Sequence, residues 1–176
     1  MEAELNILKV FFEYPEKEFY IREISRIIKV NHTTVRKYLN IFVKESYLTI
    51  NKKGLYPVYK LNTNKKSLNL KLYYNLEKLR KSGIIEKLEK DYDYPTIITF
   101  GSYASATDNS SSDIDICLIT DIKKEADYTA FEKELNRKLS FHIFSKQEWK
   151  RLKDKNPELL NNICNGITLS GKLEVV

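Results

Sequence analysis

The fold is decided by residues 96–119, which read TIITFGSYASATDNSSSDIDICLI. The first five of these residues are β-branched or aromatic, and they predict a strand over 96–100 that runs directly into Gly101 and Ser102. Ten residues later, apolar and acidic side chains begin to alternate, which predicts a second strand over 113–119. A strand, a Gly-Ser turn and an alternating strand therefore form the centre of a small domain.

The second strand carries a pair of carboxylates with a chemical implication. Because the side chains of a strand alternate between its faces, Asp113 and Asp115 lie on one face, while the apolar residues between and after them face a core. Two neighbouring carboxylates repel each other unless a cation lies between them, and Mg²⁺ prefers carboxylate and phosphate oxygens. Gly101 lets a phosphate approach the backbone closely, and Ser102 adds a hydroxyl group and an N–H group.

This arrangement resembles the signature of the DNA polymerase β-like nucleotidyltransferase superfamily, and most closely its minimal members from bacteria and archaea. The resemblance covers residues 68–176, including the C-terminal segment NPELLNNICNGITLSGKL. It implies that a nucleoside triphosphate (NTP) is the substrate and that its NMP moiety is transferred to a hydroxyl group. By the same resemblance Mg²⁺ or Mn²⁺ is the cofactor, Asp113 and Asp115 are metal ligands and catalytic residues, and Gly101, Ser102 and Ser112 bind the nucleotide.

The sequence departs from this family at two positions. Ala106 stands where a second glycine is usual, and Ser140 stands where a third carboxylate is expected on a strand over 139–144. On that strand we expect Leu139, Phe141 and Ile143 to face the core and Ser140 and His142 to face the site. Three interpretations stay open. His142 is the general base of an active enzyme, the protein binds a nucleotide without turnover, or Asp108 or Glu132 supplies the missing acid.

A compact basic segment lies ahead of this domain. Residues 20–66 contain 11 Lys and Arg against two acidic residues, although the net charge of all 176 residues is only +6. Such an uneven distribution is typical of a nucleic-acid-binding module joined to a second module. Apolar spacing predicts helices near 3–12, 21–28 and 33–43, followed by strands over 47–50 and 56–61 that are joined by a hairpin. In the first two helices, Leu5 and Ile27 are expected on the buried faces.

Three helices followed by a basic hairpin resemble the winged helix-turn-helix regulators of bacteria and archaea over residues 1–63. The resemblance implies that the third helix lies in the major groove of double-stranded DNA and that the hairpin contacts phosphates or the minor groove. The expected DNA-binding residues are His32, Thr33, Thr34, Arg36, Lys37, Asn40, Lys52 and Lys53.

The sequence thus predicts an α+β protein with two domains. Residues 1–66 form the winged helix-turn-helix, and residues 67–176 form the small mixed-sheet nucleotidyltransferase fold, with a helical connector over 67–94. No apolar run approaches the roughly 20 residues that a membrane span needs, and the acidic start MEAELN is unlike a secretory signal, so we expect a cytoplasmic protein. Cys117 and Cys164 are too isolated for a disulfide framework or a zinc site.

Two classes of function follow from these expectations. The first is a nucleotidyltransferase, of a type whose relatives act as antitoxins that modify a HEPN-type RNase partner in toxin–antitoxin operons. The second is a DNA-binding transcriptional regulator whose transferase-like domain senses a nucleotide or mediates dimerisation. A homodimer is expected under either class.

Overall fold

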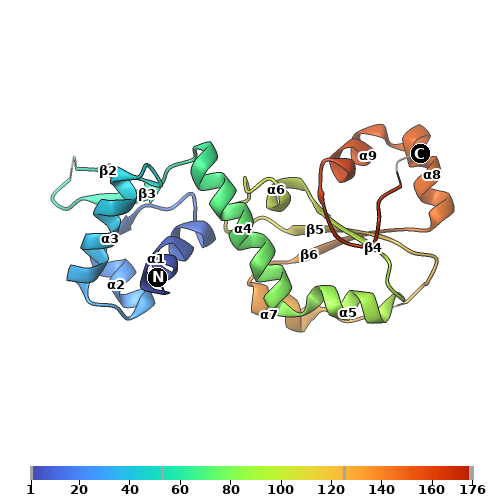
Figure 1. Cartoon of the computed structure of the whole chain (residues 1–176), viewed down its shortest axis with the longest axis horizontal. Coiled ribbons are helices and arrows are strands. Elements are labelled where there is room, and N and C mark those ends of the chain that lie inside the picture. The colour runs from blue at the N-terminus through green and yellow to red at the C-terminus, as the bar shows by residue number, and fades with distance from the viewer. Residues whose placement is uncertain (1, 53, 125, 175–176) are drawn as a thin grey trace. The chain divides into compact units, whose positions relative to one another are not determined.

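The computed structural model describes residues 2–52, 54–124 and 126–174, and the chain folds into two compact units that divide between Tyr74 and Asn75 (Figure 1). We had expected the boundary at residues 66 and 67. The division falls inside one helix, α4 (Lys65–Ser82), rather than in the polar segment ahead of it. Within the described residues, no helix is both long and apolar enough to cross a membrane.

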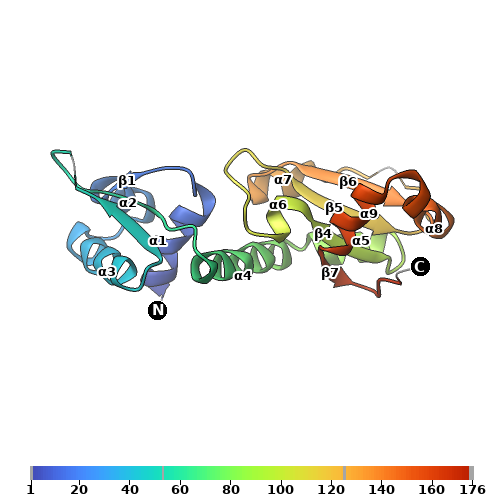
Figure 2. The same ribbon diagram turned by 90° about the horizontal axis from the view of Figure 1, so that it is seen from above.

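The first unit packs three helices against a small antiparallel sheet. Its helices are α1 (Glu2–Glu13), α2 (Ile21–Ile28) and α3 (His32–Lys44), and its strands are β1 (Phe19–Tyr20), β2 (Leu48–Asn51) and β3 (Val58–Leu61). The strand order is β1-β3-β2, so β3 is central and pairs with a strand on each side. Figure 2 shows the same chain from above, with the three helices of this unit and β1 labelled. The helix and strand order therefore follows the expected one, from three helices to a two-stranded hairpin.

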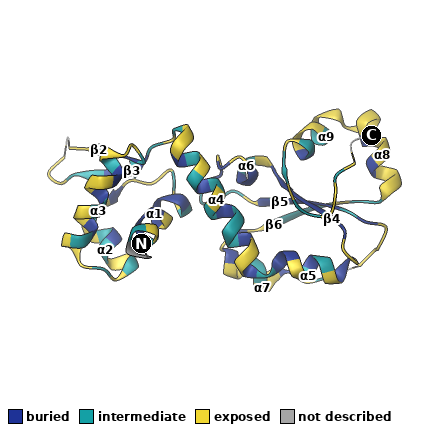
Figure 3. Ribbon diagram, in the orientation of Figure 1, coloured by how far each residue is buried: buried dark blue, intermediate teal, exposed yellow. Residues whose placement is uncertain are grey.

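Capping fixes the junction between α2 and α3. Lys29 ends α2 in the left-handed conformation, with φ +55°. Asn31 begins α3, because its side-chain oxygen accepts the N–H of Thr33 at 2.9 Å. The buried side chains of this unit include Phe11, Ile24 and Leu39, and they form one core beneath the sheet (Figure 3).

Two apolar residues of the first unit lie outside this core, contrary to expectation. Leu5 is 49% exposed and Ile27 is 54% exposed. Each lies at the margin of the apolar stripe of its helix, where a side chain at helical spacing no longer reaches the core. Ile7 and Ile24, which are nearer the centres of these stripes, are fully buried instead.

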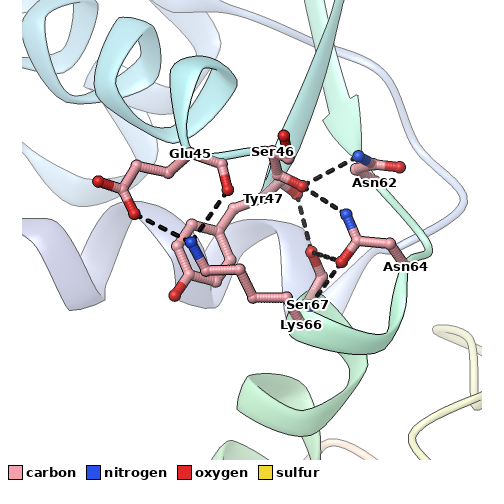
Figure 4. A network of polar contacts seen from close by, with 7 residues as sticks. All are labelled: Glu45, Ser46, Tyr47, Asn62, Asn64, Lys66 and Ser67. Carbon is pink, nitrogen blue, oxygen red and sulfur yellow. Dashed lines mark hydrogen bonds and ion pairs between the residues drawn. The ribbon is translucent and has the colours of Figure 1, made fainter.

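A polar network fixes the start of α4 in the first unit (Figure 4). Asn64 caps the helix, because its Oδ1 atom accepts the N–H of Ser67 at 3.0 Å. The Nζ atom of Lys66 donates to the carboxylate of Glu45 at 2.9 Å and lies 4.1 Å from the ring centre of Tyr47. The amide groups of Asn62 and Asn64 both donate to the carbonyl oxygen of Ser46. The end of α3 and the start of α4 are thus joined by side chains as well as by the sheet.

The second unit is a four-stranded mixed sheet with helices on both faces (Figure 1). Beyond α4 it contains α5 (Ile84–Asp91), β4 (Thr96–Phe100), α6 (Gly101–Ala104), β5 (Ile114–Ile119), α7 (Thr129–Leu135), β6 (Leu139–Phe144), α8 (Lys146–Lys155), α9 (Pro157–Cys164) and β7 (Ile167–Ser170). The strand order is β6-β5-β4-β7, and β5 and β6 are parallel while the other pairs are antiparallel. The expected α+β class with a mixed sheet is confirmed.

Alternation along the strands builds a separate apolar cluster on each face of this sheet. Ile114, Ile116 and Leu118 pack with α5 and α7 on one face. Cys117 and residues of β4 pack with α8 and α9 on the other face. Ile143 of β6 was expected in the core but is 45% exposed. Because β6 is an edge strand, Ile143 has a neighbouring strand on one side only.

Candidate functional site

Strand pairing brings the predicted site residues of three strands to one end of the sheet. Phe100 pairs with Asp115 across the antiparallel β4–β5 ladder, so Gly101 follows directly beside Asp115. Asp115 pairs in turn with Ser140 across the parallel β5–β6 ladder. Gly101, Asp115 and Ser140 therefore form a row across the start of β5, where the end of β4 and the start of β6 meet.

The approach of Gly101 to Asp115 requires glycine. Gly101 has φ +68°, and a Cβ atom built on it would lie 2.6 Å from Oδ2 of Asp115. This distance is too short for any real carbon–oxygen contact, so a side chain at this position would displace the carboxylate. The left-handed backbone adds about 1–2 kcal/mol of strain for a residue with a Cβ atom.

The loop after Gly101 is held by a buried polar contact. Asp108 is 2% exposed, and its Oδ1 atom accepts the amide of Asn75 at 3.0 Å. The same amide donates to the carbonyl oxygen of Tyr103 at 3.0 Å. The half-buried Ser102 contributes its carbonyl oxygen, which accepts the N–H groups of Thr107 and Asp108. The loop that follows the Gly-Ser turn is thereby tied to the second half of α4.

Ala106 takes the conformation that a glycine would favour. Its φ is +58° and its side chain is 1% exposed. An alanine in this left-handed region costs about 1–2 kcal/mol. Burial of its methyl group returns about 0.8 kcal/mol, so part of the backbone cost is offset. The departure from the expected glycine is therefore compatible with an intact loop.

Asp113 lies at the mouth of a cavity of about 480 Å³ at the same end of the sheet. Ser112 precedes it, and the Oγ atom of this serine accepts the N–H of Asn109 at 3.0 Å within the same loop. The opposite wall comes from the end of α7 and carries cations. The cavity is lined by Ser110, Ser111, Ser112, Asp113, Thr129, Glu132, Lys133, Asn136, Arg137 and Lys138.

His142 lies on the face of β6 that carries Ser140, as expected. Its Nε2 atom is 3.5 Å from the Oγ atom of Ser140, and its ring meets the ring of Phe100 edge-on at 5.2 Å. Cys117 pairs with His142 across the parallel ladder. Burial, with a smaller contribution from Cys164, raises the pKa of the Cys117 thiol to about 12, so this cysteine stays a neutral core residue.

The two alternative acids have other contacts. Asp108 is bound to Asn75 in the interior. Glu132 accepts the backbone N–H of Leu139 at 2.9 Å, where it helps to fix the start of β6. Among the described residues, no group of three or more His, Cys, Asp or Glu side chains converges as a metal site would require. A pair of carboxylates is nevertheless a donor set that suits Mg²⁺ when substrate phosphates and waters supply the other ligands.

Six of the eight predicted DNA-binding residues lie on α3. His32, Thr33, Arg36, Lys37 and Asn40 are exposed, and Thr34 is half-buried. Lys52 is exposed on the hairpin, and Lys53 lies outside the described residues. Three of these residues (His32, Arg36 and Asn40) and Lys52 line a groove of about 600 Å³ between α3 and the hairpin.

The same groove is completed by residues that the sequence analysis did not identify as DNA-binding candidates. Arg22 and Arg26 of α2 contribute to its wall, and so do Tyr20 and Tyr56. The one signal in the sequence was the spacing of Arg22 and Arg26, which places both on the outer face of α2. Nothing in the sequence indicated that the two tyrosines would lie across from them.

Comparison with known proteins identifies the second unit more closely than the first. The model of the family described as Polymerase beta, Nucleotidyltransferase matches residues 82–174. Two solved structures show weak likeness. A possible transcriptional regulator from Methanosarcina mazei Go1 is 18% identical, with a TM-score of 0.37, over 53% of this chain and 77% of its own. A proposed transcriptional regulator from Rhodococcus sp. RHA1 is 14% identical, with a TM-score of 0.34, over 57% of this chain and 38% of its own. No curated protein matches the chain.

Proposed function

The chain belongs to the Polymerase beta nucleotidyltransferase family, and from this premise we propose that its second unit binds an NTP with a divalent cation and transfers NMP to a hydroxyl acceptor. The observation that carries the proposal is the close approach of Gly101 to the carboxylate of Asp115. The Asp115 carboxylate fills the place that a side chain at position 101 would take, so it lies directly against the turn whose backbone would bind the phosphates. Ser102 and Ser112 lie in the loop that would surround the phosphates.

The proposed reaction is an attack by the acceptor hydroxyl oxygen on the α-phosphorus of the NTP. The bond between the α-phosphorus and the oxygen that leads to the β-phosphate breaks, and pyrophosphate leaves. Asp113 and Asp115 would hold the Mg²⁺ or Mn²⁺ ion, which neutralises charge on the phosphates when it is bound. Gly101 and Ser102 would orient the triphosphate so that the leaving oxygen lies opposite the attacking one.

His142 is our candidate for the group that accepts the proton of the acceptor hydroxyl. It lies on the polar face of β6 beside Ser140, and a neutral imidazole can accept a proton near neutral pH. A serine hydroxyl at position 140 can do neither of the tasks of a carboxylate, because it is a poor ligand for Mg²⁺ and a poor base.

The test is incubation of the full chain with NTPs labelled at the α-phosphate, Mg²⁺ or Mn²⁺, and candidate acceptors. Label should appear on an acceptor, and the double variant Asp113→Ala/Asp115→Ala should abolish it. Asp154→Ala removes an exposed carboxylate on α8 and serves as the matched control. If label transfer is absent, or if it persists in the double variant, the enzymatic proposal fails.

For the first unit the proposal is a winged helix-turn-helix domain that binds double-stranded DNA. Its support is the exposed polar face of α3 and the basic groove beside it. Arg36 and Asn40 would read base edges in the major groove, because guanine and adenine offer bidentate partners to Arg and Asn. His32, Thr33, Thr34 and Lys37 would contact bases or phosphates, and Lys52 and Lys53 would contact phosphates from the hairpin.

DNA binding can be tested by mobility shift on the promoter of the protein's own operon at several salt concentrations. Arg36→Ala/Lys37→Ala should weaken binding, relax specificity at the base that Arg36 reads, and lower the salt dependence by the equivalent of about one phosphate contact through Lys37. Lys44→Ala, an exposed cation at the end of α3, is the control. Absence of a specific shift at moderate salt would rule out this role.

A regulator without turnover is the second candidate for the whole chain, and the presence of Ser140 beside Asp115 favours it. In that case, Mg²⁺-dependent nucleotide binding without label transfer would be observed, and DNA affinity would depend on the nucleotide.

Under either function we place the protein in a toxin–antitoxin setting, with a HEPN-type RNase as the candidate partner and a homodimer as the working state. Light scattering of the full chain and pull-down with the RNase test these two assemblies.

A further inference from the structure

The groove of the first unit has the size of a small-ligand site. Its volume is about 600 Å³, within the range of roughly 300–1,000 Å³ that is usual for such sites. The start of α2, the exposed face of α3 and the hairpin strands β2 and β3 form its walls. It lies entirely inside the first unit, and none of its residues belongs to the site at Asp113 and Asp115.

The floor of the groove is apolar. Tyr59 is 2% exposed, and it pairs in register with Ile50 across the β2–β3 ladder, so their side chains lie on the same face of the sheet. Ile21 and Pro57 extend this surface. Burial raises the pKa of the Tyr59 hydroxyl above its ordinary value, and the nearby Arg36 guanidinium opposes the effect only partly. The floor therefore combines a buried tyrosine ring with half-buried apolar side chains, and a cation lies close to it.

Two tyrosine rings stand at the edge of this floor. Tyr20 is 48% exposed and Tyr56 is 63% exposed. Among the residues that the structure describes, neither ring stacks on another aromatic ring. Large exposed rings beside an apolar floor offer surfaces on which a flat aromatic group can stack.

The rim of the groove carries positive charge with little compensation. Arg22, Arg26, Arg36 and Lys52 all line it. Within 2–52, 54–124 and 126–174, none of these four cations forms an ion pair with a carboxylate. The one carboxylate of the lining is Glu23, and it accepts the N–H of Tyr20 at 2.8 Å as part of the cap of α2. An anion that enters the groove would therefore meet several unneutralised donors.

We propose that this groove is a nucleotide-binding site, separate from the transferase site, that takes an aromatic base together with its phosphates. The base would stack on Tyr56 and Tyr20 above the apolar floor, and Arg22 and Arg26 would bind the phosphates. Contact with a duplex backbone alone would use the cations but would leave the apolar floor and the tyrosines without a role. The proposal does not depend on nucleotidyl transfer, although the groove shares four residues with the surface proposed for DNA, namely His32, Arg36, Asn40 and Lys52.

A base with its phosphates can be presented either by a free mononucleotide or by the unpaired end of a nucleic-acid strand. Both are tested with the full chain carrying Asp113→Ala/Asp115→Ala, in EDTA, so that the metal-dependent site does not contribute. Fluorescently labelled ATP and GTP are titrated in one arm, and a labelled single-stranded hexanucleotide in the other. Binding is followed by fluorescence anisotropy, and a duplex of matched length is added as competitor.

The expected result is saturable binding in at least one arm. Arg22→Gln/Arg26→Gln should weaken it by about 10- to 100-fold, because charge-assisted hydrogen bonds to phosphate are lost. Tyr56→Ala should weaken it by about 5- to 100-fold through lost stacking. Lys44→Gln and Tyr73→Ala remove an exposed cation and an exposed ring outside the groove, and neither should change the affinity. Thermal unfolding checks that each variant is folded.

The two arms separate the sources, since binding of mononucleotide assigns a free ligand and binding of the hexanucleotide alone assigns a strand end. The inference is overturned if neither probe binds saturably, or if the groove variants bind as tightly as the parent chain. A duplex that still binds while both probes fail would overturn this site and leave the DNA-binding proposal intact. If the chain binds a nucleotide probe but no duplex, the DNA-binding proposal is overturned and the nucleotide site stands.

Discussion

The carboxylate of Asp115 lies against the α-carbon of Gly101 so closely that a Cβ atom there would come within 2.6 Å of Oδ2. This contact links the turn that follows β4 to the acidic face of β5. It has the consequence that the position of the carboxylate depends on the absence of a side chain one strand away. A small change in the turn at Gly101 should therefore move the Asp115 carboxylate.

Gly101→Ala should weaken binding of the Mg²⁺–NTP complex by at least about ten-fold, the equivalent of roughly 1.4 kcal/mol. The added methyl group pushes the Asp115 carboxylate aside and strains a backbone with φ +68°. Isothermal titration with a non-hydrolysable NTP measures the effect. Gly54→Ala is the control, because its nearest neighbour would be a carbonyl oxygen 3.8 Å away. Equal nucleotide affinity in Gly101→Ala and the parent chain would contradict this view of the site.

Ser140→Asp should place a second carboxylate directly beside that of Asp115. Position 140 pairs directly with Asp115, and like charges on paired residues destabilise a sheet. The variant should unfold at a lower temperature than the parent in EDTA, recover stability in Mg²⁺, and transfer NMP faster. Ser140→Asn has similar size without the charge and should show neither the loss nor the recovery. If the melting temperature of Ser140→Asp is the same in EDTA and in Mg²⁺, the result argues against a cation site beside Asp115.

Asn75→Ala should destabilise the second unit by about 2–3 kcal/mol. The amide of Asn75 donates to Asp108 and to the carbonyl oxygen of Tyr103, and both acceptors are in the interior. Loss of a donor to a buried acceptor costs about 1–3 kcal/mol. Chemical denaturation measures the change, and Asn75→Ala/Asp108→Ala should cost less than the sum of the two single variants. Additive costs would show that the two side chains act independently.

Asp91→Asn should remove an acid-sensitive part of the stability. Bonds from the Nζ atoms of Lys124 and Lys87, and from the hydroxyl of Tyr128, lower the pKa of Asp91 to about 2. Its pKa in the unfolded chain is about 3.9. Because the folded value is the lower one, the contribution is present above about pH 4 and is lost as the pH falls towards 2.

The free energy of unfolding of the parent chain, followed from pH 7 to pH 2, should therefore fall more steeply in the acid range than that of Asp91→Asn. At neutral pH the variant should already be less stable, because an amide cannot pair with two ammonium groups. Asp93→Asn, an exposed carboxylate two residues away, is the control and should reproduce the parent curve. Parallel curves for the parent chain and Asp91→Asn would mean that these contacts add nothing.

Helices and strands with a periodic apolar pattern could be predicted from the sequence. Contacts between side chains that lie far apart in the sequence could not. The strands at 96–100 and 139–144 were predicted with the bounds that the structure has, because β-branched residues and alternation are local signals. The margins of apolar stripes were harder, as Leu5, Ile27 and Ile143 illustrate, since a pattern gives the direction of a face and not how far the neighbouring element covers it.

The candidate sites divide in the same way. Asp113, Asp115 and Gly101 are candidates because of local signals, the alternation along one strand and the Gly-Ser turn after another, and the family resemblance supplies the roles predicted for them. The pairing of Asn75 with Asp108 joins residues 33 positions apart, and no periodicity indicates it. The groove of the first unit needs side chains from two helices and a hairpin to meet, so the roles of Tyr20 and Tyr56 in it could be recognised only from the structure.

The position of Ser140 also bears on how such a chain changes over generations. Its side chain is half-buried on an edge strand and belongs to neither of the apolar clusters that cover the sheet. A small polar replacement there leaves the packing of both faces as it is. An acid can therefore arise at this position without repacking of the sheet, at an electrostatic cost beside Asp115 that a bound cation would remove.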